Sequence, residues 1–226
     1  MNLIFIILSL IIVITYIYIS NKEIEYIDNS KTNELYNLLQ NIICILNVSK
    51  VDYIIIGGTL LGSIRHGGLI PWDDDADLAI LDKSPKEIFD ILQPLSKYNV
   101  YIYESKMGNL VKVKMPNSNI VIDIFPMEKN NNNIYKFKLP YDIIYKNEYF
   151  PEEEIYPIKK YKFGPLLLRG PNNAINYLNR TYPNWKTIAK KWNSKTNIFY
   201  KNEEVILDYD AKIPDSNFKK IECEIT

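Results

Sequence analysis

The spacing of apolar and polar residues predicts a folded segment that mixes helices and strands. After Thr32, which is able to cap a helix, apolar residues recur at helical spacing from Leu35 to Leu46. Val51–Ile56 is a short β-branched run typical of a buried strand. The same patterns predict further strands at Asp77–Leu81, Val100–Tyr103, Leu110–Met115 and Ile120–Phe125, and further helices at Thr59–Arg65 and Pro85–Leu92.

The signals weaken beyond Asn133. Pro126 is expected to end the strand before it, and the proline- and glutamate-rich stretch Phe150–Ile158 is expected to be a loop. A hairpin is predicted at Tyr161–Leu168, a helix at Pro171–Tyr182 and a last strand at Val205–Leu207. Because no βαβ period repeats, we expect an α+β domain around one mixed sheet flanked by helices.

An uncharged apolar run, Leu3–Ile19, precedes these elements. It has about the minimum length for a helix that crosses a bilayer, and Tyr16 and Tyr18 suit the membrane interface. The alternative is a cleaved signal peptide, but no basic residue precedes the run. We therefore expect a single-pass membrane protein, with an anchor at residues 1–20, a linker at 21–31, a folded domain at 32–199 and an extension of unknown role at 200–226.

The side of the membrane that the domain faces stays open. Lys22 and Lys31 mildly favour the cytosol under the positive-inside rule. Two glycosylation sequons, which begin at Asn47 and Asn179, weakly favour a lumenal domain.

Composition limits the classes of function. The chain has 226 residues and a formal net charge of zero, which argues against a general nucleic-acid binder. Two cysteines and one histidine cannot build a four-ligand zinc site without carboxylates. Cys44 lies in a helical apolar run and is expected to be buried, and the spacing to Cys223 decides nothing about pairing.

A glycine turn between a predicted strand and a helix is the first candidate for chemistry. Gly57 and Gly58 let the backbone approach a ligand closely, and the N–H groups of the following helix can receive an anion. This is not a P-loop, because Ser63 stands where that motif needs lysine. A plain tight turn is the alternative.

A cluster of aspartates follows the turn. Asp73, Asp75 and Asp77 share parity, so in an extended chain all three point to one face. Asp123 lies in an otherwise apolar strand, where a lone carboxylate is costly unless it is paired or bound to metal. Together these carboxylates suit Mg²⁺ or Mn²⁺, with phosphate oxygens completing the shell. An EF-hand fails, because Leu78 stands where that loop needs glycine.

Nearby basic side chains offer an explanation of the aspartates without metal, and they are also candidates for binding phosphate. A solvated acidic loop would explain the aspartates without metal, and an ion pair with Lys112, Lys114 or Arg65 would explain Asp123. Arg65 suits bidentate phosphate recognition, and His66 is the only imidazole available for acid–base work. Lys112 and Lys114 alternate on a strand, so both are able to face a substrate pocket or solvent.

The run from Gly57 to Asp77, which reads GGTLLGSIRHGGLIPWDDDAD, closely resembles the LicD family, which includes fukutin-related proteins. Ile122–Pro126 is similar to that family's second acidic motif, and Lys162-Phe-Gly, Pro171, Tyr177-Leu, Tyr182 and Trp185 are similar to its C-terminal pattern. The likeness spans roughly residues 35–185; Pro183 departs from the family's usual glycine.

The resemblance implies a nucleotidyltransferase-like fold and transfer of a substituted phosphate, such as phosphocholine or ribitol phosphate, from a CDP-linked donor to a glycan. It implies that Asp75, Asp77 and Asp123 hold the metals, that Asp73 supports them, and that Arg65 and the Gly58-Thr59 turn contact donor phosphates.

The sequence thus predicts a membrane-anchored phosphotransferase. A metal-dependent glycosyltransferase that uses an Asp-x-Asp site and a nucleotide sugar is the second hypothesis, and an inactive glycan-binding relative is the third. The donor, the acceptor and the oligomeric state are not specified by the sequence.

Overall fold

The structure is a computed structural model that describes residues 7, 10, 11, 27–106, 108–138, 140–193 and 198–206. Among these residues, no helix combines the length and apolar character needed to cross a membrane. The described residues exclude most of the predicted anchor and linker, and they exclude the tail from residue 207. Cys223, and with it any pairing to Cys44, lies in that tail. The buried position of Cys44 is confirmed.

A 20-residue helix, α2 (Asn29–Val48), opens the described domain. It begins earlier than predicted, because the Asp28 carboxylate caps it by accepting the Lys31 N–H at 2.8 Å. Thr32 is not the cap; its hydroxyl donates to the Asp28 carbonyl within the first turn. The apolar stripe of α2 is fully buried from Leu35 to Leu46, as the spacing predicted.

The predicted mixed sheet is confirmed, with seven strands. Its main path runs in the order β1-β2-β5-β4-β3, and β6 and β7 extend it from β5. The β2–β5 pair is parallel, whereas the other described pairs in this sheet are antiparallel. The strands are β1 (Tyr53–Ile55), β2 (Asp75–Leu81), β3 (Asn99–Ser105), β4 (Gly108–Lys114), β5 (Val121–Lys129), β6 (Ile134–Phe137) and β7 (Tyr149–Pro151).

The prediction that Pro126 ends β5 is wrong. The strand runs on to Lys129, with Pro126 opposite Ile80 of β2. On its other side β5 leaves β4 after Ile124 and joins β6 at Met127. Proline is tolerated because it lies in the gap between these two neighbours, where no ladder bond needs its missing N–H.

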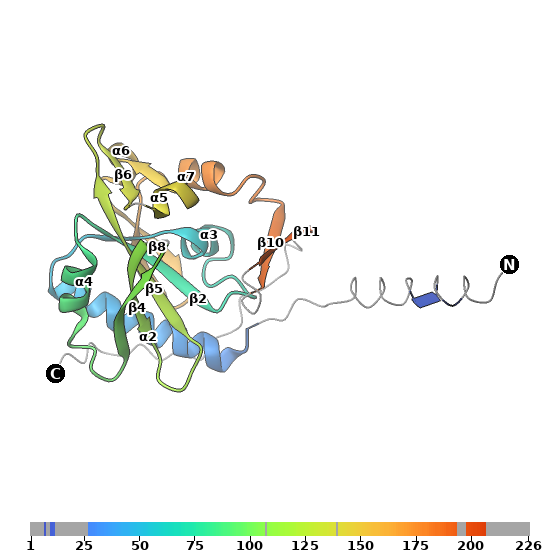
Figure 1. The fold of residues 1–226 in the computed structure, drawn as a ribbon, viewed down its shortest axis with the longest axis horizontal. Helices are drawn as coiled ribbons and strands as arrows, with labels where there is room; N and C mark the ends of the chain where they lie inside the picture. Colours follow the sequence, from blue (N-terminus) through green and yellow to red (C-terminus); the bar gives the residue numbers. More distant parts are fainter. Residues whose placement is uncertain are drawn as a thin grey trace.

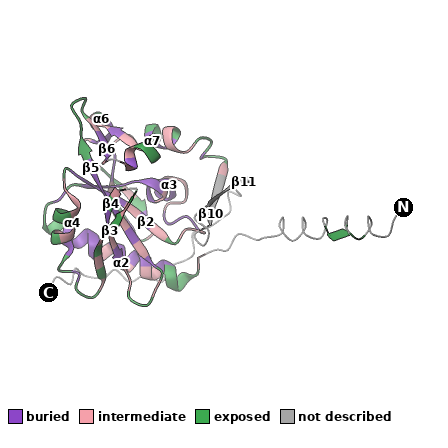
Figure 2. Ribbon diagram, in the orientation of Figure 1, coloured by how far each residue is buried: buried purple, intermediate pink, exposed green. Residues whose placement is uncertain are grey.

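The two faces of the sheet differ. One face is apolar and is covered by α2 and by α4 (Pro85–Leu92). A capping box between Ser84 and Glu87 fixes the start of α4 at the predicted position. On the other face lies α3 (Gly57–Arg65), which packs against β2 (Figure 1). Buried residues gather along α2, α3 and the sheet (Figure 2). At Asp75, Asp77 and Asp123 the second face is partly exposed, whereas the residues between and beside them on the first face are buried, so the second face is the one accessible for chemistry.

The C-terminal half adds small elements beside that accessible face. The predicted hairpin and helix are confirmed as β8 (Lys159–Phe163), β9 (Leu166–Gly170) and α7 (Ala174–Thr181). The expected loop at 150–158 is wrong: it holds the end of β7 and a helical turn, α6 (Glu152–Ile155), with Glu154 bonded to Arg180. The remaining elements are α5 (Tyr141–Ile144), β10 (Ile188–Asn193) and β11 (Ile198–Ile206).

Candidate functional site: a carboxylate row on the open face of the sheet

A row of charged side chains crosses the open face of the sheet. Asp77 of β2 stands directly opposite Asp123 of β5, which in turn stands opposite Lys112 of β4. Residues that pair across strands point to the same face, so the three side chains are neighbours. Asp75 lies two residues before Asp77 and shares its face. The sequence prediction that these aspartates come together is therefore met by the sheet register.

The β1–α3 turn closes tightly on this row. Gly57 has a φ of +56°, and a Cβ atom there would lie 2.7 Å from Asp77 Oδ2. A Cβ atom at Gly58 would lie 2.9 Å from Asp73 Oδ2. Thr59 Oγ1 accepts the Asp77 N–H at 2.7 Å. The glycines are thus required for close approach, and the first turn of α3 is held directly beside the carboxylates.

The carboxylates disfavour one another's charge. Burial, followed by the charges of Asp75 and Asp123, raises the pKa of Asp77 well above its usual value. Burial and the charge of Asp123 raise the pKa of Asp75 to about 6. Burial and the charge of Asp75 likewise raise the pKa of Asp73, whose carboxyl lies within hydrogen-bonding reach of Asp75. A cation would relieve this repulsion.

One oxygen of Asp123 has a partner and the other has none. The Lys112 ammonium donates to Oδ2 at 2.8 Å, whereas the buried Oδ1 has no hydrogen-bond partner. Burial raises the pKa of Asp123, and Lys112 opposes that rise. The predicted ion pair is therefore real, but it leaves a buried acceptor unsatisfied on the side chain that a metal would use.

The oxygen donors of the row suit a divalent ion in their chemistry, although not in their present positions. Across the described part of the chain, no three His, Cys, Asp or Glu side chains converge as they stand into a ligand set. The chemistry nevertheless fits: oxygen donors, mutual repulsion and the orphaned Asp123 Oδ1 are what Mg²⁺ or Mn²⁺ would satisfy.

Arg65 and His66 lie at the end of α3 remote from the glycine turn. Arg65 donates through Nε to His66 Nε2 at 2.9 Å and through Nη1 to the Trp185 carbonyl at 3.1 Å. Burial and the neighbouring guanidinium lower the pKa of His66 to about 4. Burial lowers the pKa of Arg65 to about 10, although the charge of Asp73 favours its cationic form. His66 is therefore neutral at physiological pH and oriented by Arg65.

Lys114 takes a different place from Lys112. It pairs across the sheet with Val121, one row beyond Asp123 and level with Asp75. Both lysines face the open side, as their alternation predicted, but Lys112 is the one that contacts a carboxylate.

Four further residues approach the row, and the motifs did not identify their roles. Gly57 N–H donates to Tyr177 Oη at 3.0 Å, and Tyr177 Oη donates to Glu148 Oε2 at 2.6 Å. The charge of Glu148 contributes to the raised pKa of Asp77. Burial raises the pKa values of Tyr145 and Tyr182, and the nearby charges of Glu148 and Asp77 raise them further. Tyr177 and Tyr182 belonged to the C-terminal resemblance, whereas Glu148 and Tyr145 carried no sequence signal.

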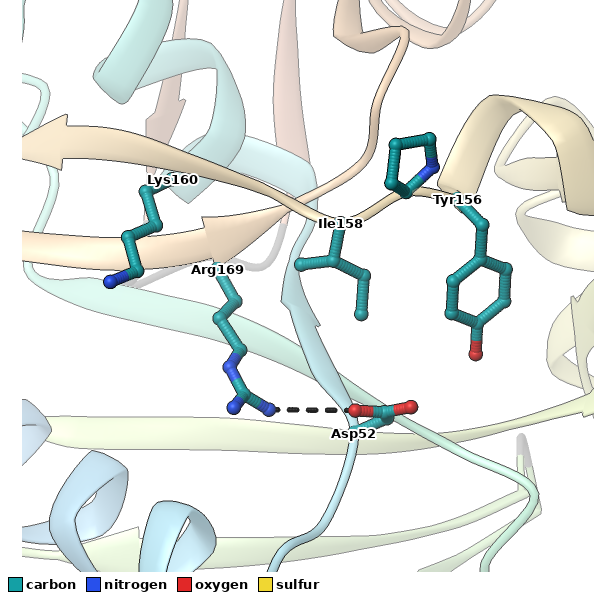
Figure 3. A pocket seen from close by; sticks show the side chains of 6 residues that line it. Asp52, Tyr156, Ile158, Lys160 and Arg169 are labelled. Atoms are coloured by element: carbon teal, nitrogen blue, oxygen red, sulfur yellow. Dashed lines mark hydrogen bonds and ion pairs between the residues drawn. The ribbon is translucent and has the colours of Figure 1, made fainter.

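A pocket of about 370 Å³ lies at the opposite end of β1 from the glycine turn. Asp52, Tyr156, Ile158, Lys160 and Arg169 line it, together with Pro157 (Figure 3). Arg169 and Asp52 approach to 3.4 Å and offset each other's charge. This pocket is separate from the carboxylate row.

The sequence that builds this site is similar to that of known proteins. Residues 50–173, more than half of the chain, match the family described as LicD/FKTN/FKRP, nucleotidyltransferase domain. An uncharacterized protein of Rickettsia prowazekii is 31% identical over 176 residues, which cover 77% of this chain and 64% of that protein.

Two further relatives have named activities. The human ribitol 5-phosphate transferase FKRP is 26% identical over 144 residues, covering 61% of this chain and 28% of FKRP. The lipopolysaccharide cholinephosphotransferase LicD of Haemophilus influenzae is 62% identical over 29 residues, covering 13% of this chain and 11% of that enzyme. The chain spans less than two thirds of the length of each of these three relatives.

Proposed function

Because this chain belongs to the LicD/FKTN/FKRP nucleotidyltransferase family, we propose that it transfers a substituted phosphate from a CDP-linked donor to a hydroxyl of a glycan. The observation that carries the proposal is the row of Asp75, Asp77 and Asp123 beside the Gly57–Gly58 turn. The transferred group is of the phosphocholine or ribitol phosphate class, which are the groups named for two relatives.

The first turn of α3 is the proposed binding site for the donor diphosphate. Helix N-termini present N–H groups that have no partner within the helix, and these groups attract anions. Gly57 N–H is already committed to Tyr177, so Gly58 and Thr59 are left to contact phosphate oxygens. Arg65 contributes a positive charge near Asp73. Its Nε and one Nη1 hydrogen bind His66 and Trp185, and its remaining N–H groups would contact a donor phosphate.

Asp75, Asp77 and Asp123 would hold Mg²⁺ or Mn²⁺, supported by Asp73. When bound, such an ion supplies Lewis-acid stabilisation of the charge on phosphate oxygens. Lys112 neutralises charge on the same row through its contact with Asp123.

The reaction forms a bond between the acceptor oxygen and the phosphorus that carries the substituent, and it breaks the bond from that phosphorus to CMP. The acceptor hydroxyl loses its proton to a carboxylate, for which Asp73 and Asp123 are the two candidates. In the full-length chain, the apolar run Leu3–Ile19 would hold this domain at a membrane where glycans are modified.

The nucleotide that is released tests the proposal. The full chain is incubated with CDP-choline, CDP-ribitol and a panel of sugar nucleotides in the presence of Mg²⁺ or Mn²⁺ and glycan acceptors. We expect CMP from a CDP-linked donor, and loss of CMP release in Asp77→Asn but not in the control Asp90→Asn, which changes an exposed carboxylate of α4.

Two results would contradict the assignment. A nucleoside diphosphate released from a sugar nucleotide would instead identify a glycosyltransferase. Full CMP release by Asp77→Asn would show that the carboxylate row does not carry the reaction.

A further inference from the structure

The carboxylate row continues to the edge of the sheet. Lys112 of β4 pairs with Tyr101 of β3, so Asp77, Asp123, Lys112 and Tyr101 form one line across four strands. Tyr103 lies two residues further along β3 and therefore shares this face. Strand β3 is the last in the described order, and its open face forms the outer border of the site.

Two tyrosine rings are exposed at this border. Tyr101 is 37% exposed and Tyr103 is 44% exposed, whereas the alternating residues Val100 and Ile102 face the other way and pack against the core. An exposed tyrosine offers a ligand an apolar ring face and a polar hydroxyl. Here the surface is continuous with the carboxylates.

Lys112 joins the rings to the reactive centre. Its ammonium lies 5.0 Å from the centroid of the Tyr103 ring and 2.8 Å from Asp123 Oδ2. Tyr141 of α5 lies near Tyr103 and Asp123, since their charges contribute to its raised pKa after burial. The tyrosines and the carboxylate row are therefore joined through Lys112.

The in-line geometry of the reaction assigns the donor to one end of the row and the acceptor to the other. In phosphoryl transfer the attacking and leaving oxygens lie roughly in line, on opposite sides of the phosphorus. The donor diphosphate fits the α3 end, where Gly58 and Thr59 lie beside Asp73 and Asp77. The acceptor then approaches from the opposite end, over β4 and β3.

We propose that Tyr101 and Tyr103 form a stacking platform for the pyranose rings of the acceptor glycan, an inference that rests on the proposed transferase function. A tyrosine ring offers an apolar face to sugar C–H groups and a hydroxyl that bonds sugar oxygens. The platform holds the acceptor so that one hydroxyl reaches the phosphate bound at the row.

Binding of sugar and nucleotide is measured separately from turnover. The full chain is mixed with CDP and either methyl pyranosides or the core oligosaccharide released from lipopolysaccharide. Saturation-transfer NMR then reports which ligand protons contact the protein. We expect pyranose C–H signals in the wild type, at least a tenfold loss of them in Tyr101→Ala/Tyr103→Ala, and unchanged cytidine signals.

Two control variants test whether the tyrosine rings themselves are responsible for the pyranose signal. Tyr101→Phe/Tyr103→Phe keeps both rings and should retain most of the pyranose signal. Leu167→Ala removes an exposed apolar side chain of β9, away from this face, and should change neither signal. In a transfer assay the double alanine variant should raise the acceptor KM at least tenfold, with the donor KM unchanged.

The remaining outcomes contradict either the tyrosine platform or the proposed transferase function. The platform is overturned by a wild type that binds no pyranoside, by a double alanine variant that keeps the pyranose signal, or by loss of the cytidine signal in that variant. Intact pyranoside binding without transfer from any donor would instead contradict the proposed function and leave the platform standing.

Discussion

At the scale of single residues, the site is built from groups that are unfavourable to one another. Four aspartates and Glu148 approach within a region that burial makes less polar, and their pKa values rise as a result. The protein keeps this arrangement although it opposes folding. Such a conflict is typical of functional sites, where activity takes precedence over stability.

Replacing Asp75 with asparagine should therefore stabilise the metal-free protein. The pKa of Asp75 is raised from 3.8 to about 6 in the folded state, so the folded state binds more protons than the unfolded state between these values. With EDTA present, the free energy of unfolding of the wild type should fall as the pH rises from about 4 to about 7.

The gain in Asp75→Asn should be near zero at pH 4 and reach roughly 1–2 kcal/mol at pH 8, where the removed charge would otherwise be ionised. Urea denaturation across this pH range measures it. A variant that is less stable than the wild type at pH 8 in EDTA would show that repulsion is not the dominant interaction of this carboxylate.

At the scale of elements, the strand–turn–helix unit from β1 to α3 determines the geometry. Its apolar strand, paired glycines and aspartate parity were readable from the sequence because each rests on local chemistry. The extent of β5 was not readable, since Pro126 is tolerated only where the neighbours of that strand change. The short turn α6 was missed because Glu154 is held by Arg180, a contact between distant residues.

Gly57→Ala and Gly58→Ala should differ in their effects. At Gly57 the positive φ strains any side chain, and the new Cβ would meet Asp77, so we expect a loss of roughly 1–3 kcal/mol in the free energy of unfolding. At Gly58 the φ is ordinary and Asp73 is able to rotate, so stability should change by less than about 1 kcal/mol while the donor KM rises. Thermal unfolding and donor titration measure both; equal stability losses would contradict this account.

Ser84→Ala should separate stability from function. It removes the capping box of α4, which lies on the apolar face away from the carboxylates, and should cost about 1 kcal/mol. Transfer activity measured well below the melting temperature should stay within about twofold of the wild type. A larger loss of activity would mean that the two faces of the sheet are coupled.

At the scale of the whole molecule, segments far apart in sequence complete the site. Tyr177 of α7 bridges the Gly57 turn and Glu148, and α7 packs beside the open face near α5 and α6 (Figure 1). The sequence predicted the helix but not this contact, because no local pattern encodes which groups a buried hydroxyl will meet. Register between strands, likewise, became evident only from the assembled sheet.

Tyr177→Phe should weaken this long-range link. It leaves the Gly57 N–H and the Glu148 carboxylate without their partner, which should cost roughly 1–3 kcal/mol. The kcat of transfer should fall more than the donor affinity, since Gly58 and Thr59 keep their places. Urea denaturation and steady-state kinetics measure the two effects, and a fully stable and active variant would rule out the bridge as a support of the turn.

The central claim is that the row of Asp75, Asp77 and Asp123 binds a divalent cation together with the donor diphosphate. The most direct measurement is calorimetric titration of Mn²⁺ into the full chain saturated with CDP, for the wild type, Asp77→Asn, Asp123→Asn and the surface control Asp90→Asn. We predict binding in the wild type and the control, and at least tenfold weaker binding in both row variants. Equal Mn²⁺ affinity in all four proteins would contradict it.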